Sequence, residues 1–135
     1  MLTSTLSVLV VDDDPDCAYT TAALLRRLGH AANVALSGAE ALRLATDLAP
    51  DVVLLDLAMP GMDGYALAEG LRLVCVGKQP FLVAVSGYCR DEDRLKASRA
   101  GIDLFLVKPV APADLFRLLD CCAEDADADR PAIEA

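Results

Sequence analysis

Five short apolar runs rich in valine and leucine alternate with stretches of helical periodicity along this chain of 135 residues. The apolar runs cover residues 6–11, 31–35, 52–55, 81–85 and 104–107, and the helical stretches cover 15–28, 37–49, 64–76, 91–100 and 112–122. Strands that alternate with helices at this spacing form parallel sheets through right-handed crossovers. The pattern therefore predicts an α/β fold with a five-stranded parallel sheet and helices on both faces.

Two of the predicted helices carry clear start signals. Ser37 with Glu40 three residues later forms a capping box, and Asp14 before Pro15 has the order of an N-cap followed by a first-turn proline.

Gly70 lies inside the third helical stretch, where it weakens a helix by about 1 kcal/mol relative to alanine. We expect that helix and its exit, VCVGKQP, to be the least regular part of the fold.

Charge and hydropathy exclude several classes of partner. The formal net charge of −9 repels phosphate backbones, so nucleic acid is not an expected ligand. No apolar run approaches the ~18 residues of a membrane span, and no signal peptide opens the chain. We therefore expect a cytoplasmic protein that does not bind membranes.

The cysteines and the acidic C-terminal segment carry no chemistry of their own in this sequence. The five cysteines lack a CxxC pair and His30 is the single histidine, so a zinc site has no support. Residues 123–135, AEDADADRPAIEA, hold five acids and no apolar periodicity. We predict one folded domain over residues 1–122, followed by an acidic tail without fixed structure over 123–135.

Polar residues follow four of the five predicted strands. The first strand runs into Asp12, Asp13 and Asp14, and Asp56, Ser86 and Lys108 close the third, fourth and fifth strands, respectively. In a flavodoxin-like (βα)5 sheet with strand order 2-1-3-4-5, these groups meet at the carboxyl edge, where open α/β sheets bind their ligands. Each residue also has a purely structural interpretation when it is considered alone. Asp14 can be a helix N-cap, Ser86 can simply end a strand, and Lys108 can be a surface lysine.

A cation is required if Asp12, Asp13 and Asp56 lie together. Two carboxylates about 4 Å apart repel by about 4 kcal/mol at an effective dielectric constant of 20, and Lys108 alone leaves the site negative. Asp56 also ends a wholly apolar strand, where an unpaired carboxylate is costly. A hard divalent ion with oxygen ligands would neutralise the rest, and Mg²⁺ suits such a site.

Five stretches together resemble the receiver domains of two-component response regulators. They are VLVVDDDPD, LGH…V…SGAEAL, DVVLLDLAMPGMDG, AVSGY and LVKP, in order and at the spacing of that family over residues 6–120. The resemblance implies that Asp56 takes a phosphoryl group from a phosphohistidine on a histidine kinase or a histidine phosphotransfer protein. It implies no enzyme activity beyond the chain's own aspartyl phosphorylation and dephosphorylation.

The resemblance also implies roles for the other groups at this edge. Asp13 would bind Mg²⁺, or alternatively Mn²⁺, together with Asp56 and the backbone carbonyl of Ala58, whereas Asp12 would act mostly through a metal-bound water. Lys108 would pair with Asp56 or with a phosphoryl oxygen, and Ser86 would hydrogen-bond another phosphoryl oxygen.

A switch is implied as well, in which Ser86 moves inward and the aromatic Phe105 rotates into the space behind it. Phe105 lacks a hydroxyl, so its rotation would change packing alone; the alternative is a plain core aromatic. Ala58 and Tyr88 stand where family members tune attack of water on the aspartyl phosphate, and Ala58 cannot position a water through its side chain.

Output would pass by protein contact to a downstream target, through the fourth and fifth helices and the strand of Phe105. One competing interpretation keeps the fold as a protein-interaction module that phosphorylation does not regulate. Another, a phosphatase of the haloacid-dehalogenase type, expects a second Asp where Ala58 stands. The sequence identifies neither the kinase nor the target.

Overall fold

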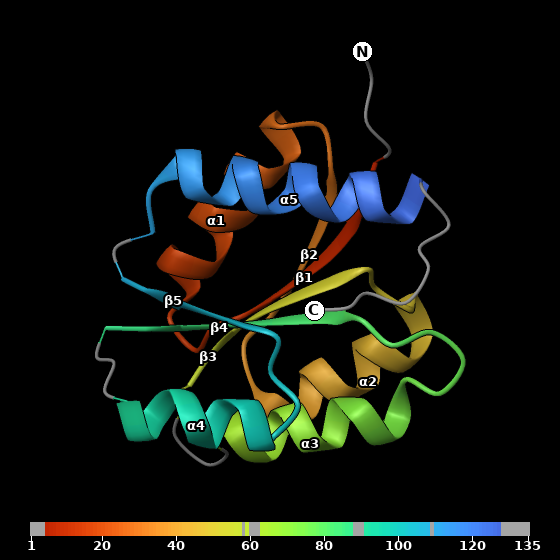
Figure 1. The fold of residues 1–135 in the computed structure, drawn as a ribbon. Coiled ribbons are helices and arrows are strands. Elements are labelled where there is room, and N and C mark those ends of the chain that lie inside the picture. Colours follow the sequence, from red (N-terminus) through yellow and green to blue (C-terminus); the bar gives the residue numbers. More distant parts are fainter. Residues whose placement is uncertain (1–4, 58, 60–62, 88–90, 109, 128–135) are drawn as a thin grey trace.

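A computed structural model describes residues 5–57, 59, 63–87, 91–108 and 110–127, in which strands and helices alternate strictly (Figure 1). The strands are β1 (Ser7–Val11), β2 (Ala31–Ala35), β3 (Val52–Asp56), β4 (Phe81–Ser86) and β5 (Leu104–Val107). The helices are α1 (Pro15–Arg27), α2 (Gly38–Leu48), α3 (Gly64–Val74), α4 (Asp91–Arg99) and α5 (Pro112–Asp127). The predicted βα alternation is confirmed.

All four strand pairings are parallel, and the strand order is β2-β1-β3-β4-β5. β3 lies at the centre, and every one of its residues is buried, as its wholly apolar sequence before Asp56 predicts. This arrangement confirms the predicted flavodoxin-like order, and it brings the carboxyl ends of β1, β3, β4 and β5 to the same edge of the sheet.

Alternate residues of each strand supply two separate cores, one on each face of the sheet. α1 and α5 cover one face, and α2, α3 and α4 cover the other (Figure 1). The first core joins β-strand valines and leucines to α1 and α5: Val8, Val10, Val52, Leu54, Val83, Ala18, Ala22, Leu25, Leu115 and Leu119. The second includes Leu9, Val11, Val53, Leu55, Leu82, Ala84, Phe105, Ala41, Ala45, Leu67, Leu71, Ala97 and Ala100. This period-2 alternation fixes which strand-end side chains face which helices.

The predicted start of α2 is confirmed. The Ser37 hydroxyl accepts a hydrogen bond from the Glu40 N–H at 3.2 Å, and the Glu40 carboxylate accepts one from the Leu36 N–H at 2.9 Å. The predicted end of the last helix was wrong, because α5 continues to Asp127 rather than stopping at Cys122. The division into a domain over 1–122 and a tail over 123–135 stays a prediction, and residues 128–135 lie outside the described part of the chain.

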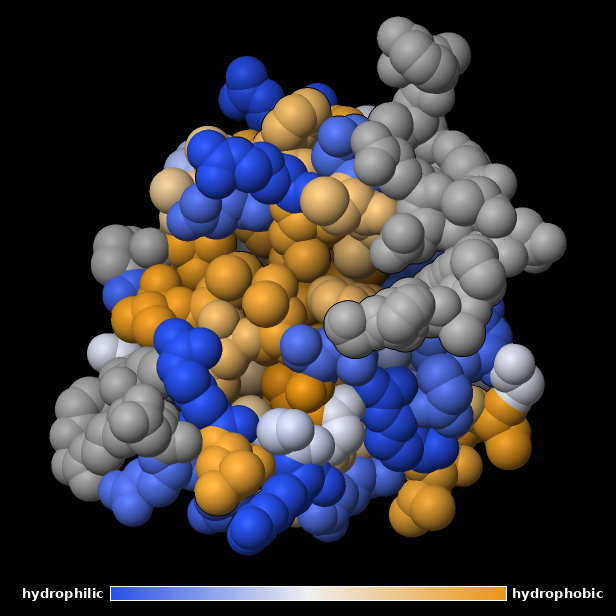
Figure 2. Space-filling model, in the orientation of Figure 1, coloured by the Kyte–Doolittle hydropathy of each residue, from blue (hydrophilic) through white to orange (hydrophobic). Residues whose placement is uncertain are grey.

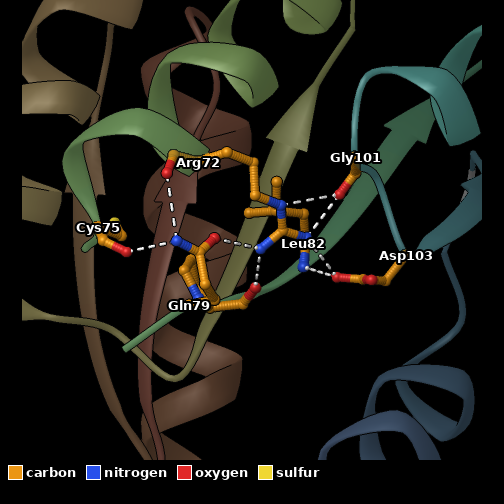
Figure 3. A network of polar contacts seen from close by, with 7 residues as sticks. Arg72, Cys75, Gln79, Leu82, Gly101 and Asp103 are labelled. Atoms are coloured by element: carbon orange, nitrogen blue, oxygen red, sulfur yellow. Dashed lines mark hydrogen bonds and ion pairs between the residues drawn. The ribbon is translucent and has the colours of Figure 1, made fainter. Parts of the chain in front are cut away.

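A polar network closes the edge of the sheet opposite the predicted site (Figure 3). Arg72 near the end of α3 contacts Asp103 at 2.8 Å, and the same Asp103 oxygen accepts the Leu82 N–H at 2.8 Å. Arg72 also donates to the carbonyl oxygens of Pro80 and Gly101. Arg72 therefore joins the end of the VCVGKQP exit to residues 101–103, a connection that periodicity alone did not predict.

Gly70 faces a close neighbour helix. A Cβ at this position would lie 3.1 Å from Leu42 Cδ2 of α2, so the glycine lets α2 and α3 approach each other. The helix-weakening effect expected of Gly70 is therefore offset by packing between the two helices. No helix within the described ranges is both long and apolar enough to span a membrane.

His30 connects the stability of this fold to pH. Its Nδ1 accepts a hydrogen bond from the Leu6 N–H at 3.0 Å, and burial lowers the pKa of the imidazole below its usual value. A depressed folded-state pKa means that the unfolded chain binds more protons, so the stabilising contribution is complete above about pH 6.5 and is lost as the pH falls. We expect the free energy of unfolding of the wild type to fall more steeply with decreasing pH than that of His30→Asn.

Because the sequence holds one histidine, the imidazole titration can be followed by NMR without assignment ambiguity. A titration midpoint at or above about 6.5 would contradict this explanation.

Candidate functional site

Three carboxylates meet where β1 and β3 end. Asp56 is the last residue of β3 and is 9% exposed. Among the residues that the structure describes, it is the one charged residue that is buried. Asp12 follows β1 directly, and its N–H extends the β1–β2 pairing by donating to the Ala35 carbonyl at 3.1 Å. One oxygen each from Asp12, Asp13 and Asp56 lies within 4.8 Å of the others. The sequence-predicted acidic cluster is therefore assembled by the ends of adjacent strands.

Lys108 supplies the positive charge at this cluster. Its Nζ lies 3.5 Å from Asp56 Oδ2 and 3.9 Å from Asp12 Oδ2. The Lys108 N–H donates to the Ser86 carbonyl at 2.7 Å, so the pairing of β4 with β5 continues one residue past the strand and sets the lysine beside Ser86. The four predicted strand ends thus come together at one edge, as the position rule for parallel sheets requires.

The pKa of the Asp12 carboxyl is raised above its ordinary value, by burial first and by the neighbouring carboxylates second. Burial is the main cause that raises the pKa of the Asp12 carboxyl, and the charges of Asp56 and Asp13 raise it further. The Asp14 N–H, which donates to Asp12 Oδ1 at 3.0 Å, and the Lys108 ammonium act in the opposite direction. One ammonium therefore does not neutralise the site, and a further cation would stabilise it.

Asp14 does not belong to this cluster. Its side chain accepts the Asp16 N–H at 3.1 Å from an extended backbone conformation, which makes it the N-cap of α1 with Pro15 in the first turn. The predicted N-cap role of Asp14 is confirmed, whereas the predicted metal site of Asp12, Asp13 and Asp56 stays a prediction that the closeness of their oxygens supports.

Gly64 is a residue of this site that the sequence reasoning missed. A Cβ at Gly64 would lie 2.6 Å from Leu57 Cα and 2.9 Å from the Asp56 carbonyl oxygen, distances that real Cβ atoms do not adopt. The Gly64 N–H donates to the Leu57 carbonyl at 3.1 Å, and Asp63 caps the helix by accepting the Ala66 N–H at 2.8 Å. The start of α3 is therefore pressed against the backbone that carries Asp56. The Asp-Gly pair in GMDG was the available signal, because it places an N-cap before a helix start.

Phe105, the predicted switch residue, is buried against the α2–α4 face at 9% exposure and is paired in register with Ala84. The Arg94 guanidinium carbon of α4 lies 5.5 Å from the centre of its ring, within the range of a cation–π contact. Phe105 thus already occupies an inward position. The predicted metal ligand Ala58, as well as Tyr88 and Pro109, lies outside the described residues.

The residues present suit a hard divalent cation. Carboxylate oxygens are the ligands that Mg²⁺ prefers, and it takes one or two of them while water and phosphoryl oxygens complete its shell. Oxygens of three carboxylates lie close together beside the Lys108 ammonium, and they match that donor set. A buried aspartate next to such an ion and an ammonium can act as a nucleophile toward phosphorus.

The model of the response regulator receiver domain family matches residues 8–120 of the chain. The protein belongs to this receiver family. Apart from Ser7, the match covers all five strands, and it includes the predicted site residues, so the resemblance seen in the sequence is confirmed. The matched family is not that of the phosphatase interpretation.

Curated relatives of this receiver domain differ in length. The chain is 38% identical over 125 residues to an uncharacterized 14.6 kDa protein in the sodA1 3' region of Leptolyngbya boryana, which covers 91% of this chain and 95% of that protein. It is 39% identical over 108 residues to the transcriptional regulatory protein PrrA of Mycobacterium leprae, which covers 80% of this chain but 46% of PrrA. The chain thus spans less than half of that regulator.

One solved structure connects the receiver fold to a metal. The receiver domain of sensor histidine kinase PA1611 from Pseudomonas aeruginosa, with a magnesium ion coordinated in its active-site cleft, matches with a TM-score of 0.79 and 28% identity. The match covers 90% of this chain and 99% of that one. A receiver domain of this fold therefore binds Mg²⁺ in its cleft.

Proposed function

We propose that this receiver domain takes a phosphoryl group onto Asp56 in the presence of Mg²⁺ and thereby switches a protein-binding face. The single observation that carries the proposal is the geometry around Asp56. This buried carboxylate lies 3.5 Å from the Lys108 ammonium and within 4.8 Å of two further carboxylates. The closeness of three carboxylates, one of them buried, is explained by a divalent cation that offsets their charge and that would also neutralise charge on an incoming phosphoryl group.

In the proposed transfer, an Asp56 oxygen attacks the phosphorus of a phosphohistidine and forms a P–O bond. The P–N bond breaks, and its electron pair returns to the imidazole of the donor. Lys108 would hold the charge on one phosphoryl oxygen, while Ser86, at the end of β4, would donate a hydrogen bond to another.

Asp12, Asp13 and Asp56, with the Ala58 carbonyl, would hold the ion, and either Mg²⁺ or Mn²⁺ would neutralise charge on the transferring group when bound. The donor would be a histidine kinase or a histidine phosphotransfer protein, in line with the resemblance of the chain to a receiver domain that belongs to a sensor histidine kinase. The chain would act on no substrate other than its own Asp56.

The proposed output face lies over α4, β5 and α5. Apolar side chains gather between α5 and β5 on the face shown in Figure 2. Leu95 of α4 is 54% exposed and Phe116 of α5 is 52% exposed, with Leu104 and Val107 of β5 also open to solvent. Phe105 lies on the same strand, so a change in its packing would reach this face directly, and a downstream protein would read it there.

Phosphate uptake tests the proposal. We expect the intact mass of the purified protein to rise by one phosphate on incubation with Mg²⁺ and a small acyl-phosphate donor, and to stay unchanged when a chelator removes the metal. Mn²⁺ is expected to replace Mg²⁺.

The alternative is a receiver-like interaction module that phosphorylation does not control. Absence of an adduct with any donor, with either metal present, would support that alternative. Phosphate uptake that persists when the chelator is present would instead contradict the proposed requirement for a metal ion.

A further inference from the structure

A cavity of about 590 Å³ extends from the acidic cluster along the face of the sheet that α1 and α5 cover. Its walls are mostly apolar: Val10, Leu54 and Leu106 come from the strands, Leu24 from α1, and Leu115 from α5. The volume lies in the range of pockets that hold small molecules, which is roughly 300–1,000 Å³. The proposed phosphoryl transfer at Asp56 would use the polar end of this space and leave its apolar part without a role.

The helix walls contribute hydroxyl groups as well as apolar surface. Thr20 and Thr21 of α1 line the cavity, and Val110 and Pro112 line it where the chain enters α5. An apolar space with a few polar groups and one charged end is the usual composition of a small-molecule site.

Charge is confined to one end of this cavity. Asp12, Asp56 and Lys108 line that end, and Asp13 completes the acidic cluster just beyond it. Among the residues that the structure describes here, three carboxylates against one ammonium leave a formal net charge of −2. Both carboxylates in the wall are largely buried, with side chains 13% and 11% exposed for Asp12 and Asp56, so little water screens them. An anionic head group would be repelled at this end, and a cationic one attracted.

We propose that this cavity binds a small amphipathic cation, whose ammonium group lies against Asp12 and Asp56 and whose apolar body fills the space between the sheet, α1 and α5. The acidic end of the cavity suits the ammonium group of such a ligand, and the apolar walls suit its apolar body. A purely apolar molecule would add no positive charge to carboxylates that Lys108 offsets only in part, and a metal ion alone would leave the apolar walls uncovered.

Such a ligand would compete with a divalent metal ion, because both need the same carboxylate oxygens. It would therefore exclude the metal on which the proposed phosphorylation depends. The binding itself does not rest on that function, since it can be measured on the unphosphorylated protein without any phosphoryl donor.

Three probes of one size and different charge test the proposal by NMR of the methyl groups. They are 2-phenylethylamine, neutral 2-phenylethanol and anionic phenylacetate. We expect the amine to shift the methyl signals of Val10, Leu54 and Leu115, with an affinity about tenfold higher than that of the alcohol, a difference of about 1.4 kcal/mol. Phenylacetate is expected to bind most weakly. Saturating Mg²⁺ should weaken the binding of the amine and leave the binding of the alcohol unchanged.

Variants separate the two parts of the site. Thr21→Phe, which fills the cavity from the α1 side, is expected to abolish binding of both amine and alcohol, and Val110→Phe does the same from the α5 side if the first variant is unstable. Thr46→Phe, on the exposed surface of α2, is the matched control and should bind as the wild type does. Asp12→Asn should remove the preference for the amine and retain the alcohol.

Absence of methyl shifts with all three probes would overturn the proposal, as would equal binding of amine and phenylacetate. Shifts that persist in both cavity-filling variants would place the binding elsewhere and overturn it too. Since phosphate uptake is not measured, a failure here leaves the proposed role of Asp56 unaffected, and loss of that role would leave this result unaffected.

Discussion

Replacement of Asp56 by asparagine is expected to abolish the phosphate adduct while the protein stays folded. Asparagine keeps the shape of the side chain and its place at the end of β3, but its amide is not a nucleophile toward phosphorus. The change also removes one of three carboxylates that lie within 4.8 Å of one another. Relief of that repulsion should leave the free energy of unfolding unchanged or somewhat higher.

Asp47→Asn is the matched control, because Asp47 is an exposed aspartate in the last turn of α2 and is not part of the acidic cluster. We expect its phosphate uptake and its unfolding midpoint to match those of the wild type. Intact mass after incubation with Mg²⁺ and donor, together with urea unfolding of all three proteins, gives both readouts. An adduct of undiminished yield in Asp56→Asn would show that another residue accepts the phosphoryl group.

Replacement of Gly64 by alanine is expected to have the largest effect on stability. The added Cβ would meet backbone atoms, Leu57 Cα at 2.6 Å and the Asp56 carbonyl oxygen at 2.9 Å, and backbone cannot rotate away as a side chain can. Overpacking of this kind costs roughly 1–3 kcal/mol. Because the displaced backbone carries Asp56, we also expect weaker binding of Mg²⁺, measured by titration calorimetry.

Gly77→Ala separates the clash from the general effect of removing a glycine. A Cβ at Gly77 has no neighbour within 4 Å, so the substitution should be neutral or stabilise the protein by a few tenths of a kcal/mol through the unfolded state. Equal stability of Gly64→Ala and Gly77→Ala would show that the start of α3 moves freely and does not position Asp56.

The fold was predictable because its information is local. Each strand is a short run of β-branched and leucine residues, and signals such as the Ser37–Glu40 capping box mark where helices begin. The right-handed crossover rule then leaves few ways to arrange such units. The end of α5 was less predictable, because its last turn carries no apolar periodicity, and helix boundaries depend on weak local preferences.

Much of the site was predictable for a similar reason. One topological rule brings five residues to one edge, because each lies at the carboxyl end of a strand or within two residues of it: Asp12, Asp13, Asp56, Ser86 and Lys108. Contacts made by residues within helices could not be predicted in this way. The need for glycine at position 64 and the bonds of Arg72 to Gly101 and Asp103 depend on approaches between distant segments, which periodicity does not encode.

The most direct test of the central claim is to locate the phosphoryl group on the chain. An aspartyl phosphate is reduced by borohydride to homoserine, which changes the mass of the peptide that contains it. After phosphorylation with Mg²⁺ and an acyl-phosphate donor, reduction and proteolysis, we predict homoserine at position 56 and at no other aspartate. Homoserine at Asp12 or Asp13, or its absence from a protein that has gained one phosphate in intact mass, would contradict the account.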